Sequence, residues 1–285
     1  METVWWLLGQ IYDKGLMYKG YTIQPYSPKA GTGLSSHEIN QPGAYQDVKD
    51  TTCVAQFKVK SDQTVPFDSA DLNQLYFLAW TTTPWTLPSN TALTVGPKIE
   101  YVLVKTYNQY THEPIQVILA KNLIGKQFGK KFKAVENEAD LIYAAGDKKV
   151  PYYIAEECLG ADLTGIKYEQ LLDFALPYED ADKAFVVIPG DFVTTEDGTG
   201  IVHTAPTFGA DDAAVAKDSG VPSLLILDEN EQTVPLVDLQ GRFRKEVSDP
   251  IFGFGGEYVK AEYLSDAETA TEFQKQKENL KSSRQ

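Results

Sequence analysis

Short apolar runs, separated by turn residues, recur along most of this chain from about Val48 onward. They are rich in β-branched and aromatic side chains, which favour strands. The runs lie at Cys53–Val59, Leu75–Thr82, Thr91–Val95, Tyr101–Lys105, Gln116–Ala120, Val150–Ala155 and Ala184–Ile188. Many short strands with turn signals predict a β-barrel or β-sandwich rather than a doubly wound sheet. The expected fold is mainly β with short helices (α+β), including helical pieces at 122–125 and 161–172.

The bulk properties are those of a globular domain. At 285 residues, with 42% hydrophobic and 23% charged residues, the chain can bury a substantial core. No apolar run reaches the roughly 20 residues that a membrane span requires, so no membrane partner is expected. The N-terminus lacks the basic leading region of a signal peptide. Cys53 and Cys158 lie far apart without metal-ligand spacing, which favours buried thiols in a reduced, cytoplasmic setting.

The net charge of -14 argues against a chain that grips a nucleic acid backbone by itself. It does not argue against a pocket that receives only the end of a nucleic acid held elsewhere. The basic clusters at Lys126–Lys133 and Arg242–Lys245 are small, and such clusters are typical of a solvated surface.

The two ends of the chain differ from its middle. Apolar residues at helical spacing predict a helix from Val4 that ends near Gly15. A strand is expected at Tyr18–Ile23, and a Gly/Pro-rich turn at 25–33. Ser265 opens a capping box, and a charged helix is expected over 266–281. We therefore predict a flanking segment at 1–47, a β-barrel domain at 48–250 and a return segment at 251–285.

One stretch stands out, where the expected strand 75–82 runs into two prolines. Residues 80–90 read W-T-T-T-P-W-T-L-P-S-N. Pro84 and Pro88 each remove a backbone donor and fix φ, so the strand cannot continue and a Pro-rich loop is expected. Three consecutive threonine hydroxyls thus sit at the end of a rigid strand, a position suited to a binding or catalytic pocket.

A second stretch carries a histidine and two carboxylates. Residues 198–212 read G-T-G-I-V-H-T-A-P-T-F-G-A-D-D. Asp197-Gly198 is a turn signal, which predicts a hairpin over 191–205 with His203 near the end of its second strand. A short helix should follow at 213–217 and stop at Gly220.

Together these two motifs resemble the paired signatures of the editing domain of class I aminoacyl-tRNA synthetases, in the isoleucyl form. The resemblance implies a proofreading deacylase that hydrolyses the ester of valyl-tRNA(Ile) and excludes isoleucyl-tRNA by size. It also implies a fragment, because the chain lacks the motifs that carry ATP binding and aminoacyl transfer in the family. Family members often carry two zinc-binding cysteines where this chain has Ser27 and Ala30, so no metal site is predicted.

The resemblance assigns roles to particular residues. Asp212 is expected to anchor the substrate ammonium, since a carboxylate makes a strong charge-assisted bond to a cation. Asp211 is assigned to capping the following helix, although either acid could serve only that purpose. Thr82 and Thr83 are the catalytic candidates around the ester, and Thr83 is expected to help reject the isoleucyl group.

His203 is the last catalytic candidate, for a ribose hydroxyl or the attacking water, although a lone strand histidine is more often structural. The candidate substrate-binding residues are Thr81, Trp85, Asn90, Phe208 and Gly209. The two aromatic residues among them could equally be core packing, and Asn90 could equally hold the loop.

The expected partners are the 3′ end of mischarged tRNA(Ile), its valine moiety and the rest of a synthetase chain. No cofactor is expected in this fragment, since ATP and Mg belong to the catalytic domain of the parent enzyme. Three alternatives remain: an editing domain of a valyl or leucyl synthetase, a non-catalytic tRNA-binding module, and a metal-dependent hydrolase. Three scattered histidines without ligand spacing make the last the weakest.

Overall fold

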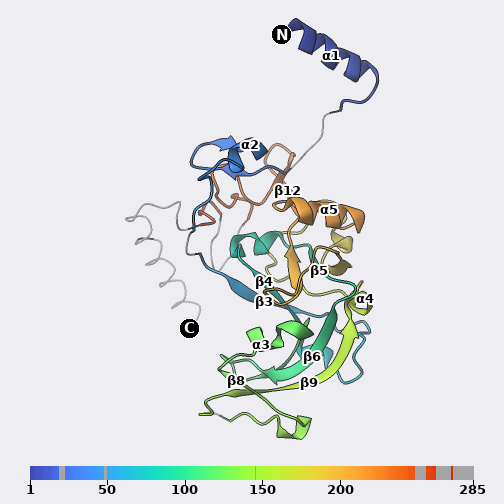
Figure 1. Ribbon diagram of the computed structural model, residues 1–285, viewed down its shortest axis with the longest axis vertical. Coiled ribbons are helices and arrows are strands. Elements are labelled where there is room, and N and C mark those ends of the chain that lie inside the picture. Colours follow the sequence, from blue (N-terminus) through green and yellow to red (C-terminus); the bar gives the residue numbers. More distant parts are fainter. Residues whose placement is uncertain (19–22, 48–49, 145, 248–254, 261–270, 272–285) are drawn as a thin grey trace.

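The computed structural model describes residues 1–18, 23–47, 50–144, 146–247, 255–260 and 271 (Figure 1). One large sheet dominates this part of the chain, and short helices surround it. The prediction of a mainly β fold with short helices is confirmed.

The large sheet contains nine strands: β3 Cys53–Lys58, β4 Leu75–Thr81, β5 Ala92–Val95, β6 Glu100–Tyr107, β7 Pro114–Ala120, β8 Phe132–Ala134, β9 Val150–Leu159, β10 Val186–Pro189 and β11 Ile201–Thr204. Two small antiparallel pairs stand apart from it, β1 Tyr26–Ser27 with β2 Thr32–Gly33, and β12 Leu225–Leu227 with β13 Thr233–Pro235. All seven strand runs expected from the sequence are therefore confirmed, with shifted ends.

The α-helices are short apart from the first and the last: α1 Glu2–Asp13, α2 Ser36–Ile39, α3 Ile124–Gln127, α4 Gly160–Leu163 and α5 Ala210–Asp218. The 3-10 helices are η1 Leu72–Gln74, η2 Pro84–Ser89, η3 Lys121–Leu123, η4 Glu138–Asp140 and η5 Ala181–Lys183. Helix α1 buries none of its residues and lies apart from the sheet (Figure 1). Within the described ranges, no helix has both the length and the apolar character to cross a membrane.

Strand β4 is the branching strand of the sheet. One of its edges pairs with β3 along almost its whole length, in antiparallel register from Tyr76 to Thr81. Its other edge is shared, because β7 pairs with its first half in parallel and β11 pairs with Trp80 in parallel. The sheet therefore divides along β4, with β7, β6, β9 and β8 on one branch and β11, β5 and β10 on the other.

The two faces of β4 contribute to different hydrophobic clusters. Leu75, Phe77 and Ala79 face the main core, together with side chains of β3, β5, β10 and β11. Leu78 faces a second cluster, which β6, β7 and α3 complete. A strand buried on both faces needs apolar side chains at nearly every position, which explains why 75–80 is an unbroken apolar run rather than an alternating one.

The expected barrel is not a closed ring of strands in the described part of the chain. Residues 165–169, which form no named strand, bridge the gap between β10 and β3 instead. Tyr168 N donates to Phe185 O, and Val187 N donates to Ile166 O, on the β10 side. Lys60 N donates to Lys167 O, and Glu169 N donates to Lys58 O, on the β3 side. An irregular segment thus completes the enclosure of the main core.

Two local predictions are wrong. The helix expected over 161–172 is only α4, since Gly165 has φ +88°, which no helix allows, and the chain beyond it is the bridging segment. The hairpin expected over 191–205 is absent, because β11 pairs with β5 and β4 rather than with 192–193. The Asp197-Gly198 turn does exist, with φ +75° at the glycine, but it leads β11 into the middle of the sheet.

The predictions for the two ends of the chain are only partly covered by the described residues. The first helix is confirmed as α1, and a small hairpin lies within the expected 25–33 turn. Most of the strand expected at Tyr18–Ile23 lies outside the described residues, as does the capping box at Ser265 and nearly all of the 266–281 helix.

Candidate functional site

The two sequence motifs meet at one edge of the sheet. Val202 of β11 pairs in parallel with Trp80 of β4, and Thr199 Oγ1 accepts a hydrogen bond of 3.2 Å from Trp80 N. Because parallel strands end at the same edge, the segments after Thr81 and Thr204 leave the sheet side by side. The threonine turn and the segment that leads to Asp212 are therefore neighbours.

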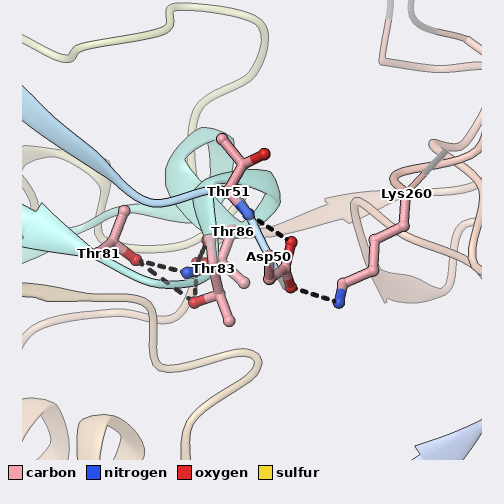
Figure 2. A network of polar contacts seen from close by, with 6 residues as sticks. All are labelled: Asp50, Thr51, Thr81, Thr83, Thr86 and Lys260. Atoms are coloured by element: carbon pink, nitrogen blue, oxygen red, sulfur yellow. Dashed lines mark hydrogen bonds and ion pairs between the residues drawn. The ribbon is translucent and has the colours of Figure 1, made fainter. Parts of the chain in front are cut away.

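The threonine turn is held by its own hydroxyls (Figure 2). Thr83 N donates to Thr81 Oγ1 at 3.0 Å, and Thr86 Oγ1 donates to Thr83 O at 2.8 Å. Thr81 is buried, whereas Thr82 and Thr83 are exposed. Thr82 and Thr83 are thus accessible in a turn that Thr81 anchors, and the Thr83 hydroxyl also lies 3.4 Å from Thr81 Oγ1 and 3.5 Å from Thr86 Oγ1.

The Pro-rich segment after the turn is a 3-10 helix, η2, rather than the expected loop. Pro84 occupies its first turn, where a missing N–H leaves no bond unmade. A helix of this kind places Thr86 directly below Thr83, since residues three apart overlap in a 3-10 helix. Sequence reasoning missed Thr86 as a site residue, although it lies inside the motif.

His203 lies under this turn and is almost fully buried, with 7% of its surface exposed. Asn90 Nδ2 lies 2.9 Å from its Nδ1, and Thr86 Oγ1 lies 3.0 Å from its Nε2. The Asn90 amide nitrogen is a donor, so Nδ1 accepts and the proton of the neutral ring sits on Nε2. Burial lowers the pKa of His203 from 6.5 to about 4, so the ring is neutral at pH 7.

Asn90 is buried deeper still, at 3% exposure. Its Nδ2 also donates to Ala92 O at 2.8 Å, and its Oδ1 accepts from the Tyr168 hydroxyl at 2.6 Å. Of the two roles open from the sequence, this geometry favours the one that holds the loop. Tyr168 lies outside both motifs, and no sequence signal pointed to it.

Asp212 lies in the first turn of α5 and is partly buried. Its Oδ2 accepts a hydrogen bond of 2.9 Å from Ala205 N, whereas Oδ1 has no partner among the described residues. Burial raises the pKa of Asp212, against the opposing effect of the Ala205 N–H. A partly buried carboxylate with an open oxygen is a favourable place for a cation, because a cation would offset the desolvation of the charge.

The residues around Asp212 clarify two expectations. Gly209 is the N-cap of α5, and no side chain caps this helix, so the assignment of Asp211 as the cap is wrong. Asp211 is exposed in the first turn, where it can interact only with the helix dipole. A Cβ atom built on Gly209 would lie 2.7 Å from Asp212 Oδ2, so any other residue there would crowd the carboxylate in its present position.

Trp85 and Phe208 join the two motifs through their rings, which meet edge to face with centroids 4.9 Å apart. Both are partly buried against the cluster of Leu224, Leu236 and Phe243. Trp85 Nε1 is buried and has no hydrogen-bond partner in the described part of the chain. The two rings therefore pack against this cluster, and Trp85 lies in η2, directly after the threonine turn.

The segment before β3 also reaches this region (Figure 2). Asp50 Oδ2 lies 3.2 Å from Lys260 Nζ, which joins two segments 210 positions apart. The Thr51 N–H and then Lys260 lower the pKa of Asp50. Across residues 1–260, apart from the undescribed gaps, no three His, Cys, Asp or Glu side chains cluster as a metal site would require.

Comparison with known proteins agrees with the two motifs. The sequence-family model described as tRNA synthetases class I (I, L, M and V) matches residues 1–83. The isoleucine–tRNA ligase of Cytophaga hutchinsonii is 58% identical over 276 residues, 97% of this chain. The chain belongs to the class I aminoacyl-tRNA synthetase family. The isoleucine–tRNA ligase of Bacteroides thetaiotaomicron, 59% identical over 85% of the chain, is a second relative of this synthetase segment.

The synthetase segment spans less than a quarter of these relatives, 23% of the first and 21% of the second. Two solved structures are similar to it at low identity. "The crystal structure of GlLeuRS-CP1" aligns with 81% of this chain and 83% of its own, at 19% identity and a TM-score of 0.41. The Plasmodium knowlesi cytosolic leucyl-tRNA synthetase editing domain aligns with 59% of this chain and 62% of its own, at 15% identity and a TM-score of 0.42.

The buried histidine predicts a specific acid sensitivity of this synthetase segment. The pKa of His203 is lower in the folded chain than in the unfolded chain, so unfolding takes up a proton between pH 6.5 and about 4. The stability that depends on the neutral ring is complete above pH 6.5 and is lost as the pH falls through about 4. The gap between the two pKa values corresponds to about 3 kcal/mol.

Urea unfolding of the wild type and of His203→Gln at pH 7.0, 5.5 and 4.5 measures this contribution, because other groups affect both chains alike. The free energy of unfolding should fall more steeply with acid in the wild type. His112→Gln, which removes an exposed histidine, should behave as the wild type does. Parallel curves for all three chains would show that His203 titrates normally.

Proposed function

We propose that this chain is the proofreading domain of an isoleucyl-tRNA synthetase, which hydrolyses the ester of mischarged valyl-tRNA(Ile). The observation that carries the proposal is Asp212, a partly buried carboxylate with an open oxygen beside an exposed threonine turn. An α-ammonium and an ester carbonyl lie close together in any aminoacyl-tRNA. A site for such a substrate needs one group that binds the ammonium and another that binds the ester, on neighbouring segments.

The need for a second site follows from a limit on binding. Valine is one methylene smaller than isoleucine, and a hydrophobic pocket gains only about 1–3 kcal/mol from that difference, for which this pair of amino acids is the standard example. A synthetic site alone therefore charges valine too often. A hydrolytic site that is too small for isoleucine removes the error, since the correct product cannot enter.

The residues support hydrolysis by positioning. In this mechanism Asp212 binds the ammonium, and the exposed Thr82 and Thr83 hydroxyls bind the ester and a water molecule. His203 supports Thr83 through Thr86, because its ring nitrogens are both occupied. No nucleophile with an adjacent base stands among the candidates, so we infer direct attack by water, with the 3′ hydroxyl of the substrate assisting.

Specificity in this proposal comes from the wall beside the turn. Thr83 contributes the group that rejects the longer isoleucyl side chain, and Trp85 and Phe208 form apolar surface for the valine moiety or the terminal adenine. Thr81 and Asn90 contribute by holding the turn, and Gly209 by leaving room for Asp212.

The partners follow from the charge and from the length of the chain. With a net charge of -14, the domain is suited to receive only the 3′ end of tRNA(Ile), while the rest of the synthetase chain binds the tRNA body. Aminoacylation with ATP and Mg is assigned to that remaining part. We place the whole enzyme in the cytoplasm, with translation.

The test is a deacylation assay with valyl-tRNA(Ile) and isoleucyl-tRNA(Ile), in this chain and in the complete synthetase. The wild type should hydrolyse the valyl ester and spare the isoleucyl ester. Thr83→Ala removes a hydroxyl and a methyl from the wall, so hydrolysis of the isoleucyl ester should rise by roughly tenfold or more. Thr51→Ala, which shortens an exposed threonine before β3, is the matched control.

Equal hydrolysis of both esters by the wild-type synthetase would contradict the size-exclusion proposal. No hydrolysis of either ester by the complete enzyme would contradict the proofreading function itself. The complete synthetase serves as the reference for rate, since an isolated domain lacks most of the tRNA-binding surface.

A further inference from the structure

The bridging segment 165–169 has a second consequence besides completing the enclosure of the core. It carries Tyr168 into the middle of the protein, where the side chain is completely buried. The ring is held edge on between Phe57, with centroids 5.4 Å apart, and Phe185, with centroids 6.2 Å apart. A ring fixed on both sides points its hydroxyl in one direction only.

That direction is toward Asn90. The Tyr168 hydroxyl donates to Asn90 Oδ1 at 2.6 Å and so holds the oxygen side of the amide. The nitrogen side faces two carbonyl oxygens, which can only accept, Ala92 O at 2.8 Å and Thr204 O at 3.4 Å, and also His203 Nδ1 at 2.9 Å. An amide that donates to Nδ1 excludes a proton from that nitrogen.

The remaining links run to the threonine turn. A neutral His203 with Nδ1 unprotonated carries its proton on Nε2 and donates it to Thr86 Oγ1. The Thr86 hydroxyl, having accepted that bond, donates its own proton to Thr83 O. The Tyr168 hydroxyl, the His203 ring N–H and the Thr86 hydroxyl thus form one continuous series with the Asn90 amide, and this series reaches the backbone of Thr83.

We infer that Tyr168 is a positioning residue for the threonine turn: its hydroxyl fixes the Asn90 amide, and through it a single tautomer of His203. The expected effect of Tyr168 on hydrolysis rests on the proposed function, whereas its expected effect on the His203 tautomer does not. Tyr168 touches no substrate in this account. Its substitution should slow the chemical step without weakening the binding of aminoacyl-tRNA.

The expected tautomer of His203 can be tested on the wild type alone. The chain contains three histidines, so 15N-histidine labelling gives few ring signals, and His37→Gln and His112→Gln identify those of His203. We expect His203 to be a single tautomer with Nε2 protonated and Nδ1 unprotonated at pH 7. A proton on Nδ1 would overturn the proposal without any variant at Tyr168.

The variant Tyr168→Phe removes only the hydroxyl and leaves the ring contacts. We expect the His203 signals to shift toward a mixture of tautomers. In deacylation of valyl-tRNA(Ile) by the complete synthetase, kcat should fall by roughly tenfold with KM within about twofold of the wild type. Tyr101→Phe is the matched control, since Tyr101 is equally buried and donates its hydroxyl proton to Gly200 O at 2.6 Å, with no bond to Asn90.

The outcomes separate the two proposals. His203 signals in folded Tyr168→Phe that match those of the wild type would refute the positioning role, whatever the activity. Altered signals with an inactive wild type would refute the proposed function and support the positioning role. If Tyr168→Phe does not fold, Asn90→Ser, which removes the amide that faces Nδ1, must disturb the same His203 signals, and unchanged signals there would refute the proposal.

Discussion

We expect Asp212→Asn to lower the hydrolysis of valyl-tRNA(Ile) by roughly 100-fold, because the bond between an ammonium and a partly buried carboxylate contributes up to about 3 kcal/mol. Asparagine has nearly the same shape and keeps an oxygen that can accept from Ala205 N, so the fold should survive. The measurement is the rate of ester hydrolysis by the complete synthetase at pH 7 under single-turnover conditions.

Asp211→Asn is the matched control for this variant. It removes the same charge from the preceding position in the same helical turn, where the side chain is exposed. Its rate should lie within about twofold of the wild type, since an exposed charge is screened by solvent. Similar losses in the two variants would show that net charge near the helix, rather than an anchor at Asp212, supports the reaction.

The second large effect concerns the fold. Gly200 directly precedes β11 and has φ +72°, a conformation that L side chains rarely adopt, and a Cβ atom built there would lie 2.3 Å from Ala120 Cβ. Gly200→Ala therefore combines backbone strain of about 1–2 kcal/mol with overpacking of about 1–3 kcal/mol. We expect a loss of about 2–5 kcal/mol in the free energy of unfolding, measured by urea denaturation.

Gly220→Ala separates the two causes. Gly220 follows α5 with φ +70°, nearly the same conformation, but a Cβ atom there has nothing within 4 Å. Only the backbone strain of about 1–2 kcal/mol should remain. Equal losses at the two positions would mean that the close approach of position 200 to Ala120 relaxes at little cost, and that Ala120 does not limit which residue position 200 accepts.

Sequence reasoning identified the residues of the candidate site that lie in the two motifs, but it missed those that only support the threonine turn. Thr82, Thr83 and Asp212 lie in ordered motifs, and their residue types suit hydroxyl and ammonium contacts, so they were identifiable. Tyr168 is a single tyrosine in a segment whose pattern predicted a helix. Its importance depends on Gly165 ending that helix and on two flanking hydrogen-bonded segments far away in sequence.

His203 is a second residue whose role the sequence could not decide. A histidine near the end of a strand can titrate, bind substrate or be structural, and the sequence left these readings open. The structure favours a neutral, supporting ring, because Asn90 and Thr86 occupy both nitrogens and burial lowers the pKa to about 4. His203 is distant in the sequence from Thr86 and Asn90, and only the pairing of β11 with β4 and β5 brings them together.

The sequence by itself determined where most strands of the large sheet lie and which two motifs carry the candidate site. These properties follow from the local order of apolar, β-branched and proline residues, which acts over a few positions. Only the tertiary structure decided which strands pair, how residues 165–169 bridge the sheet, and which side chains stand beneath the threonine turn. Those features depend on hydrogen bonds and packing between segments that are distant in the sequence, and no local pattern encodes such contacts.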